Sequence, residues 1–552
     1  MKNKKYLFLF LIIIFFAAFL RLYRISDVPP GVNRDEASIG YTAYSLIKTG
    51  ADEYGIKFPL SFQSFGDWKL PFYIYVTAIS VKIFGLSEFA VRFPSALFGI
   101  ATVGLTFFLV KKLFNNNILS FLSMALMAIS PWHLHLSRVG SEANSAVFLI
   151  VLGLFFFLIS LKEKCWLITL SFLLFALSYY AYAGNHIFTT IFIIGLIYFY
   201  RKKIPKTKWF YASILLFTVL SGFIFYQTFF IADKTKLSGV SIFSDPSLQF
   251  VEIETLRNEH DNTFIAKAFH NPIILGLERF MQNYLNSFSP DFLFFKGGTN
   301  NAHNIDGFGN MYVIESLSLL FGLVYLFTSK KNKEVKLILF WFFISPLAVS
   351  ITKDAPHSTR MFAIFPILPL IVAFGIYYLF NQIKNTKIKN LLIIIVIFAF
   401  ALNFIKYLDL YYLHFPKNEA ASWGTGYKKL VSILNNPKIS DKKIVVSYPE
   451  TSPYIFMLFY SKYSPEKYQK NAVRYNPTSE GFIHVKQFDK YEFRHIDWSG
   501  EIKKTDRILV DVPLNVSDFT KKQNFPTENV ILPNGEIMFK VVEITEKANF
   551  NY

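Results

Sequence analysis

Long apolar runs separated by short polar links fill residues 6–408 of the chain. Many runs are about 18 to 22 residues long, the length at which an α-helix crosses a hydrocarbon layer ~30 Å thick. The pattern predicts eleven membrane-spanning helices, at residues 6–23, 90–110, 118–134, 146–161, 166–182, 187–200, 209–230, 311–328, 336–351, 361–380 and 391–408.

Two runs need separate interpretation. The first run, Tyr6–Leu20, follows three lysines, as the apolar part of a signal peptide does. It is followed by Arg21-Leu-Tyr-Arg24 and not by a small-residue cleavage site, so we expect a retained first span. The second, Leu70–Phe84, is short for a span, and a crossing there would reverse the side of every later link. We therefore expect an interfacial helix at this position.

Basic residues are concentrated in alternate links between the apolar runs. The clusters are Lys2, Lys4 and Lys5; Lys111 and Lys112; Lys162 and Lys164; Arg201, Lys202, Lys203, Lys206 and Lys208; Lys330, Lys331, Lys333 and Lys336; and Lys384, Lys387 and Lys389. By the positive-inside rule these links face the cytoplasm. The pattern predicts a multi-pass protein of the plasma or inner membrane with a cytoplasmic N-terminus and an extracytoplasmic C-terminus.

Three long regions then fall on the outer side: residues 24–89, residues 231–310 with an amphipathic stretch at 266–288, and residues 412–552. The last is more polar and contains two strand-like runs, Lys443–Ser447 and Arg507–Val512. Residues 423–434 and 453–460 have helical patterns. We expect an α-helical polytopic membrane domain at residues 1–411, with outer-face interfacial helices, and a small extracytoplasmic α/β domain at residues 412–552.

Composition agrees with a membrane protein, because 53% of the residues are hydrophobic and only 17% are charged. The net charge of +19 comes largely from the links, so it indicates topology and not nucleic-acid binding. The single cysteine, Cys165, excludes an internal disulfide. The chain contains no Walker-type phosphate loop, no Rossmann glycine pattern and no metal-binding Cys/His cluster.

The most informative polar segment is Arg34-Asp35-Glu36, just outside the first span. At the water–lipid boundary, desolvation raises a carboxylate pKa and a nearby cation lowers it, so such a group can be both ionised and basic. Asp35 with Glu36 is therefore a candidate general base. The alternative is that Asn33 or Asp35 caps a helix that runs to about Lys48 and ends at Gly50.

Other ionisable residues fall on the same predicted side. Lys69 is either a phosphate ligand or an ordinary snorkelling lysine, whose aliphatic chain lies on apolar surface while its ammonium reaches water. Arg138 and Glu142, in a very short link, either face a cavity or pair with each other. Arg360, with His357 nearby, either binds phosphate bidentately or anchors to headgroups.

Two further segments carry candidate residues with a simpler alternative. Tyr182 and His186 belong to an aromatic segment that is also typical of an interfacial belt. His303 lies in a loop rich in turn formers, which by itself indicates only an ordered loop.

Several motifs in this order resemble a known family. They are Arg34–Glu36, Asp67–Pro71, Ser87–Ser95, Ser130–Gly140, Phe288–Gly298 and Pro356–Arg360. The pattern resembles the C-type membrane glycosyltransferases, specifically the dolichyl-phosphate-mannose–protein mannosyltransferases (glycosyltransferase family 39 group) and the aminoarabinose transferases. The similarity covers about the first 410 residues.

The resemblance implies inverting transfer of a sugar from a polyprenyl-phosphate donor to a hydroxyl acceptor on protein, lipid or cell-wall glycan. It implies that Asp35 is the base, that Glu36 supports it, that Lys69 and Arg360 hold the donor phosphate, and that Arg138 shapes the site. The other candidate contacts with the donor are Arg34, Glu142, Tyr182, His186, His303 and His357. No cofactor is required by this chemistry, and a divalent cation near the phosphate is compatible with it. Bacterial relatives often show Tyr-x-Tyr followed by an arginine where this chain has Asn185-His186.

Two other classes of protein fit part of the pattern. A transporter or flippase of lipid-linked sugars explains phosphate-binding cations, but it gives no special need for the Asp35-Glu36 pair and the chain shows no similar halves with broken helices. A catalytically inactive scaffold that presents the C-terminal domain is the other alternative.

Overall fold

The computed structural model describes residues 4–232, 241–244, 251–259, 263–300, 302–329, 332–439, 441–478, 481–516 and 525–545. Of the lysines used for topology, Lys2, Lys330 and Lys331 lie outside these residues, as does part of the predicted loop 231–310. The chain divides into two compact units. The helical unit comprises residues 1–23 and 95–410, and the α/β unit comprises residues 24–94 and 411–552.

Each of the predicted apolar spans lies on, or overlaps, a helix or a pair of consecutive helices, which confirms the helical membrane fold. These helices are α1 (Lys4–Leu22), α4 (Glu88–Phe114), α5 (Asn117–Ile129) with α6 (Pro131–Ser137), α7 (Glu142–Ser160), α8 (Leu167–Ala181), α9 (Asn185–Tyr200), α10 (Lys208–Tyr226), α15 (Glu315–Thr328), α16 (Lys333–Ile344) with α17 (Leu347–Ser350), α18 (Ile367–Gln382) and α19 (Thr386–Asp409).

Among the described residues, five helices are long and apolar enough to cross a membrane, namely α1, α4, α7, α10 and the helix that begins with α19. The pair α5 and α6 makes a sixth if its 59° bend lies within one span. The bend falls at Pro131, which disfavours helical backbone at the residue before it. The shorter apolar helices include α8, α9, α15 and α18, so the count of eleven crossings stays a prediction.

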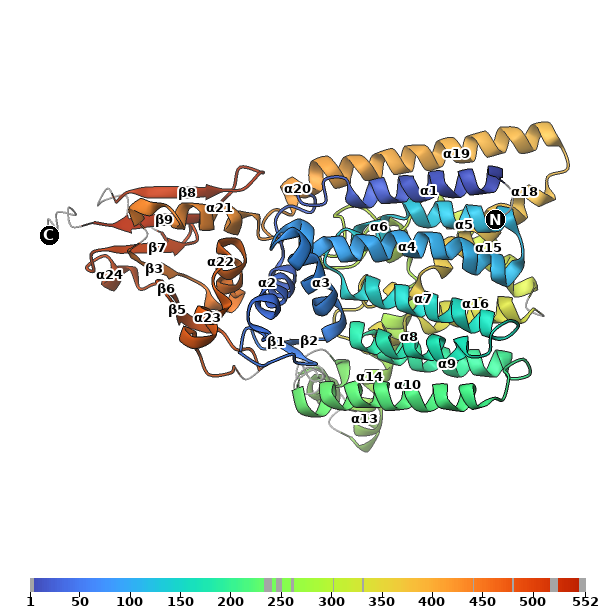
Figure 1. Ribbon diagram of the computed structural model, residues 1–552, viewed down its shortest axis with the longest axis horizontal. Helices are drawn as coiled ribbons and strands as arrows, with labels where there is room; N and C mark the ends of the chain where they lie inside the picture. The colour runs from blue at the N-terminus through green and yellow to red at the C-terminus, as the bar shows by residue number, and fades with distance from the viewer. Residues whose placement is uncertain are drawn as a thin grey trace. The chain divides into compact units, whose positions relative to one another are not determined.

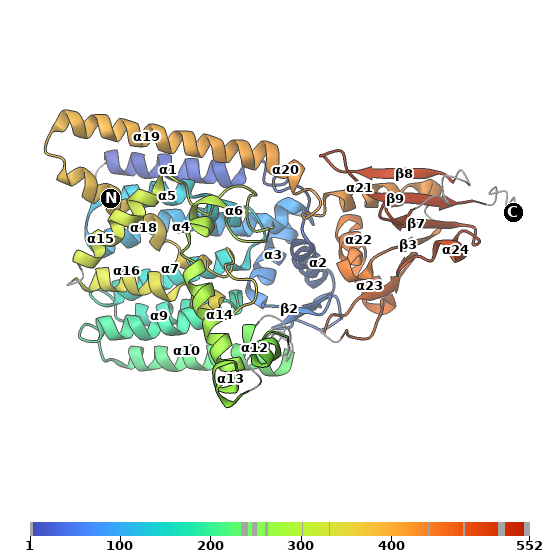
Figure 2. The same cartoon turned by 180° about the vertical axis from the view of Figure 1, so that it is seen from behind.

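Two observations on packing fit a lipid environment. Helix α1 runs beside α19 in both Figure 1 and Figure 2, with Phe16 and Phe404 ring centroids 6.0 Å apart. Only 17% of the apolar window of α1 and 6% of that of α19 is buried within the protein, as expected of lipid-facing helices. Elsewhere small residues let helices approach closely, since a Cβ on Gly375 of α18 would lie 1.8 Å from the Ser318 carbonyl oxygen of α15.

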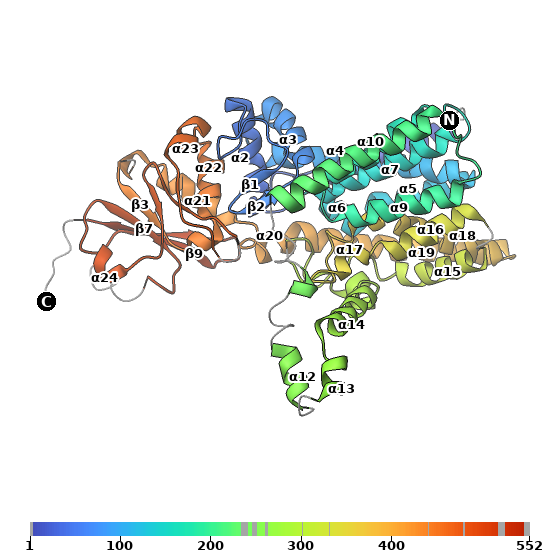
Figure 3. The same ribbon diagram turned by 90° about the horizontal axis from the view of Figure 1, so that it is seen from below.

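The amphipathic stretch predicted at residues 266–288 is helical. Figure 3 shows α12 (Ile253–Glu259), α13 (Phe264–Phe269) and α14 (Pro272–Asn286) running across the direction of the long helices of the same unit. On α14 the side chains of Ile273, Leu277, Met281 and Leu285 are all more than half exposed at a spacing of four residues. A crosswise helix with an exposed apolar stripe is the geometry expected of an interfacial helix.

The α/β unit contains a seven-stranded sheet with the order β4-β5-β6-β3-β7-β9-β8. Strand β3 pairs in parallel with β6 and β7, and the other pairs are antiparallel. The strands are β3 (Lys443–Val446), β4 (Val473–Arg474), β5 (Val485–Phe488), β6 (Tyr491–Phe493), β7 (Arg507–Asp511), β8 (Thr527–Ile531) and β9 (Ile537–Ile544). Helices α21 (Thr425–Leu434), α22 (Pro453–Ser461) and α23 (Pro465–Asn471) lie on the sheet, and α24 (Trp498–Glu501) precedes β7.

The first long loop belongs to the same unit. It forms α2 (Arg34–Thr49), the hairpin β1 (Phe62–Ser64) and β2 (Asp67–Lys69), and α3 (Pro71–Phe84). Their apolar side chains share one core with those of the C-terminal segment, including Ile39, Tyr41, Phe65, Tyr73, Ile444, Tyr454, Phe456 and Phe488. The domain boundary expected between residues 411 and 412 stays a prediction. The structure adds that residues 24–94 pack with the C-terminal segment.

Candidate functional site

Asp35 lies in the first turn of α2, and the structure separates its role from that of the helix cap. The Asn33 side chain accepts a hydrogen bond from the Glu36 amide at 2.8 Å, so Asn33 is the N-cap. At the other end Gly50 adopts a left-handed conformation and closes the helix. Of the two predicted capping residues, the cap is therefore Asn33. The Asp35 side chain is 58% exposed and available for other contacts.

Lys69 forms an ion pair with Asp35. Its Nζ lies 2.8 Å from Asp35 Oδ1 and 3.0 Å from Asp67 Oδ2, and its side chain is only 5% exposed. The Lys69 ammonium and the Arg34 guanidinium both contact the Phe65 ring, at 5.0 Å and 4.5 Å from its centroid. A single hairpin turn thus supports the two cations that flank Asp35.

This arrangement keeps Asp35 ionised. The surrounding protein disfavours the charged carboxylate, but the nearby Lys69 ammonium and its hydrogen bond outweigh that effect and hold the pKa of Asp35 below its usual range. The amide groups at the N-terminus of α2 favour negative charge as well. At neutral pH the exposed carboxylate can accept a proton.

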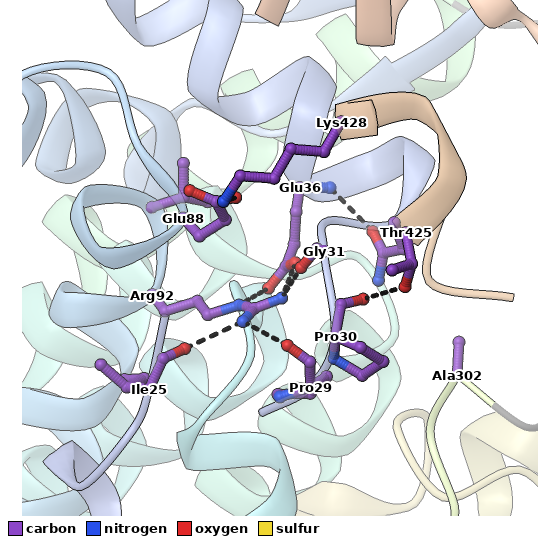
Figure 4. Close-up of polar contacts among 12 residues, drawn as sticks. Ile25, Pro29, Pro30, Gly31, Glu36, Glu88, Arg92, Ala302, Thr425 and Lys428 are labelled. Carbon is purple, nitrogen blue, oxygen red and sulfur yellow. Dashed lines mark hydrogen bonds and ion pairs between the residues drawn. The ribbon is translucent and has the colours of Figure 1, made fainter. Parts of the chain in front are cut away.

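Glu36 points the other way and is buried against Arg92. Arg92 Nε donates to Glu36 Oε1 at 2.9 Å, and Nη2 donates to Oε2 at 2.8 Å. Figure 4 shows that Arg92 also donates to the carbonyl oxygens of Ile25, Pro29 and Gly31. These contacts use all five donors of the guanidinium. Through Arg92, Glu36 is therefore tied to the loop that leads into α2.

The C-terminal segment holds the same loop from its other side. The Thr425 hydroxyl donates to the Pro30 carbonyl oxygen at 3.1 Å, and Lys428 pairs with Glu88 at 2.7 Å (Figure 4). The Trp423 ring lies 5.5 Å from the Arg92 guanidinium carbon. The backbone around Asp35 is therefore fixed by residues distant in sequence.

In the helical unit, a second group of predicted residues surrounds Arg360. Arg360 forms a hydrogen-bonded ion pair with Asp354, and His357 Nε2 lies 3.8 Å from the same carboxylate. The His303 and His357 ring centroids are 5.0 Å apart. Burial, with the neighbouring His303 and Arg360, lowers the pKa of His357 to about 3, so this imidazole is neutral. A phosphate at Arg360 would compete with Asp354.

The remaining predicted residues of the helical unit are largely engaged with other groups. Tyr182 interacts electrostatically with Arg360 and Glu142. The Arg138 side chain is fully buried and donates to the Leu20 carbonyl oxygen at 2.6 Å. His186 stacks on Tyr179 with 4.5 Å between ring centroids, and its Nε2 lies 2.8 Å from the Tyr179 carbonyl oxygen.

The predicted site residues thus form two groups, one in each unit. The α/β unit brings together Arg34, Asp35 and Lys69, and the helical unit brings together Glu142, Tyr182, His303, His357 and Arg360. Asp67 and Arg92 were not predicted as site residues, although both lie within the motifs that carry the resemblance. Among the described residues, no group of three or more His, Cys, Asp or Glu side chains is placed to hold a metal ion.

Comparison with known proteins agrees with this architecture. Residues 69–226 match the family described as dolichyl-phosphate-mannose-protein mannosyltransferase. No curated protein matches the chain. ArnT from Cupriavidus metallidurans, solved bound to undecaprenyl phosphate, superposes with a TM-score of 0.55 at 10% identity, and 99% of each chain is covered. The apo structure of the same ArnT superposes with a TM-score of 0.53 at 11% identity, and 98% of this chain and 97% of that chain are covered.

A third similar structure is the archaeal oligosaccharyltransferase AglB from Archaeoglobus fulgidus, solved with an inhibitory peptide and a dolichol-phosphate. The TM-score is 0.50 at 13% identity, covering 83% of this chain, which spans 64% of the AglB chain. The shared fold confirms the predicted fold class, an α-helical polytopic membrane protein with the fold of the C-type glycosyltransferases, and the family match over residues 69–226 agrees with it.

Proposed function

We propose that this protein is an inverting glycosyltransferase that moves a sugar from a polyprenyl-phosphate donor to a hydroxyl group of a protein, lipid or cell-wall glycan. The observation that carries the proposal is the exposed Asp35 carboxylate, paired with Lys69 at the start of α2. The positive-inside pattern of the links supports a site at the outer face of the plasma or inner membrane, with the N-terminus in the cytoplasm.

Asp35 is the general base of the proposed reaction. The acceptor hydroxyl attacks the anomeric carbon on the face opposite the phosphate, and its proton passes to Asp35. The bond from the anomeric carbon to the phosphate oxygen breaks, and polyprenyl phosphate leaves with the electron pair. One carboxylate suffices because the configuration inverts in a single displacement, unlike the two-carboxylate retaining scheme.

Cations stabilise the charge that develops on the departing phosphate. Arg34 is the best placed of the predicted ligands in the α/β unit, because it contacts Phe65 and has no carboxylate within ion-pair distance among the described residues. Lys69 already faces two carboxylates, so its first role is to set the charge and position of Asp35.

The test is Asp35→Asn in membranes supplied with a labelled polyprenyl-phosphate sugar. Transfer is expected to fall by at least about 100-fold, as for loss of a general base, while donor binding persists. Asp27→Asn is the matched control, because Asp27 lies on the same loop with a 64% exposed side chain paired only loosely with Arg24.

Two outcomes would overturn the proposal. One is normal transfer by Asp35→Asn. The other is movement of labelled donor across the membrane by the wild-type protein with no glycosylated product detected by mass spectrometry, which would favour a flippase.

A further inference from the structure

The hairpin that carries Lys69 is held by the C-terminal segment through the backbone of its turn. Strands β1 and β2 are joined by Phe65 and Gly66, both with positive φ. The Phe65 amide donates to the Tyr454 hydroxyl at 3.1 Å, across 389 positions of sequence. The Phe65 carbonyl oxygen accepts from the Ile483 amide at 3.2 Å. Both polar backbone groups of the turn residue thus bind the C-terminal segment.

The Tyr454 hydroxyl is fixed in turn by a buried carboxylate. It donates to Glu53 Oε1 at 2.9 Å, and the Ser64 hydroxyl donates to Glu53 Oε2 at 3.3 Å. Glu53, Ser64, Phe65 and Tyr454 are all at most 2% exposed. A buried hydrogen-bonded group of this kind specifies one geometry, because a displaced partner would leave a polar group unsatisfied.

Close backbone contact adds a second constraint on the turn. A Cβ on Gly66 would lie 2.5 Å from the Gly481 carbonyl oxygen and from Phe482 Cα. The turn can therefore approach residues 481–483 this closely only with glycine at position 66. The Phe65 ring, held in this way, is the surface on which Lys69 and Arg34 rest beside Asp35.

From this chain of contacts we propose that Tyr454 is a positioning residue for the transfer reaction: through the Phe65 turn, its hydroxyl sets the distance between Lys69 and the base Asp35. The proposal rests on the function proposed above. It gives the C-terminal segment a direct part in the geometry of the site, beyond any role in recognising the acceptor.

The main variant is Tyr454→Phe, which removes only the hydroxyl. We expect kcat per folded molecule to fall about five- to tenfold, the effect of one lost buried hydrogen bond, with little change in KM for the donor. We also expect the acid limb of the kcat profile to move to higher pH, because a displaced Lys69 lowers the pKa of Asp35 less. A purely structural role would reduce the folded yield without moving that limb.

Tyr468→Phe is the matched control. Tyr468 lies in the same core, its ring is nearly parallel to that of Tyr454 at 6.3 Å, and its hydroxyl has no hydrogen-bond partner among the described residues. Its kcat and pH profile should match those of the wild type. In a Lys69→Gln background, Tyr454→Phe should move the acid limb no further.

A second pair of variants tests the turn without Tyr454. Gly66→Ala and Gly55→Ala both place a side chain at similar positive φ, 87° and 84°, but the Gly55 position has open space. Only Gly66→Ala should lower kcat and shift the acid limb. Wild-type kcat and pH profile in Tyr454→Phe and Gly66→Ala, with Asp35→Asn inactive, would overturn this inference alone. Activity of Asp35→Asn would instead overturn the proposed function.

Discussion

The Asn33 side-chain oxygen accepts a hydrogen bond from the Glu36 amide at 2.8 Å, one residue past Asp35. This contact supplies the N-terminal cap of α2, so the Asp35 carboxylate is not needed to satisfy the helix end. Asp35 instead pairs with Lys69. Capping and proton transfer are therefore assigned to different side chains, and each assignment can be tested separately.

The cap predicts a loss of stability in Asn33→Ala. Removing the side-chain acceptor leaves the Glu36 amide unpaired, so the free energy of unfolding should fall by ~1 kcal/mol. Asn33→Ser keeps an acceptor and should restore most of that loss. Denaturant unfolding of the detergent-solubilised protein measures both values. Equal stability of the alanine and serine variants would show that the contact does not contribute as a cap.

The buried Arg92 predicts that even a conservative change is costly. Lysine keeps the charge but has three donors at one point, whereas Arg92 serves five acceptors on Glu36, Ile25, Pro29 and Gly31. Arg92→Lys should lower the free energy of unfolding by roughly 2 to 4 kcal/mol because buried acceptors lose their donors. Limited proteolysis of the loop before α2 provides a second readout.

Arg279→Lys is the control for this substitution. Arg279 pairs with Glu252 on the surface, with side chains 48% and 39% exposed. Arg279→Lys should change the free energy of unfolding by no more than about 0.5 kcal/mol, as for most exposed ion pairs. Equal effects of the two arginine-to-lysine changes would contradict the role given to Arg92.

The sequence predicted those features that depend on local pattern. Apolar runs located the helices, and Asn33 and Gly50 marked the ends of α2, because span length and capping are set by neighbouring residues. The resemblance placed Asp35 and Lys69 in one site but assigned Lys69 to the donor phosphate, so the ion pair between them was not predicted. Only two of the seven strands of the sheet were predicted, since strands such as β4 and β6 are too short to show alternation.

The parts that sequence reasoning missed depend on contacts between distant segments. Arg92 has the pattern of a charge at the start of a span, and nothing near it in sequence indicates that Glu36 is its partner. Phe65 is one phenylalanine among 64. The bond from Phe65 to Tyr454 becomes visible only when the first loop and the C-terminal segment share a core.

The ion pair with Asp35 predicts a shift in pH dependence for Lys69→Gln. The reaction needs ionised Asp35, and Lys69 holds the pKa of that carboxyl below its ordinary value. Without the ammonium, the surrounding protein raises this pKa, so the acid limb of kcat/KM should move to higher pH. Lys57→Gln, an exposed change on the same loop, should leave the limb in place. An unmoved limb in Lys69→Gln would mean that Lys69 does not control Asp35.

Glu53 predicts that the stability of the α/β unit depends on pH. Burial raises the pKa of Glu53 from 4.5 to about 7, and Arg474 and the Tyr454 hydrogen bond only partly oppose this rise. Between these two values the folded state binds more protons than the unfolded state. The stability that Glu53 contributes is therefore fully present below pH 4.5 and is lost as the pH rises through about 7.

Glu53→Gln should remove this part of the pH dependence while keeping acceptor and donor groups beside Tyr454 and Ser64. The midpoint temperature of thermal unfolding, measured at several pH values between 4.5 and 7, should fall with rising pH in the wild type. In the variant it should depend less on pH. Glu528→Gln on β8, where the side chain is exposed, should leave the wild-type slope unchanged because solvent screens that carboxylate in both states. If the Glu53 variant kept the full wild-type slope, protons would be taken up elsewhere, and the carboxylate that fixes Tyr454 would be ionised throughout this range.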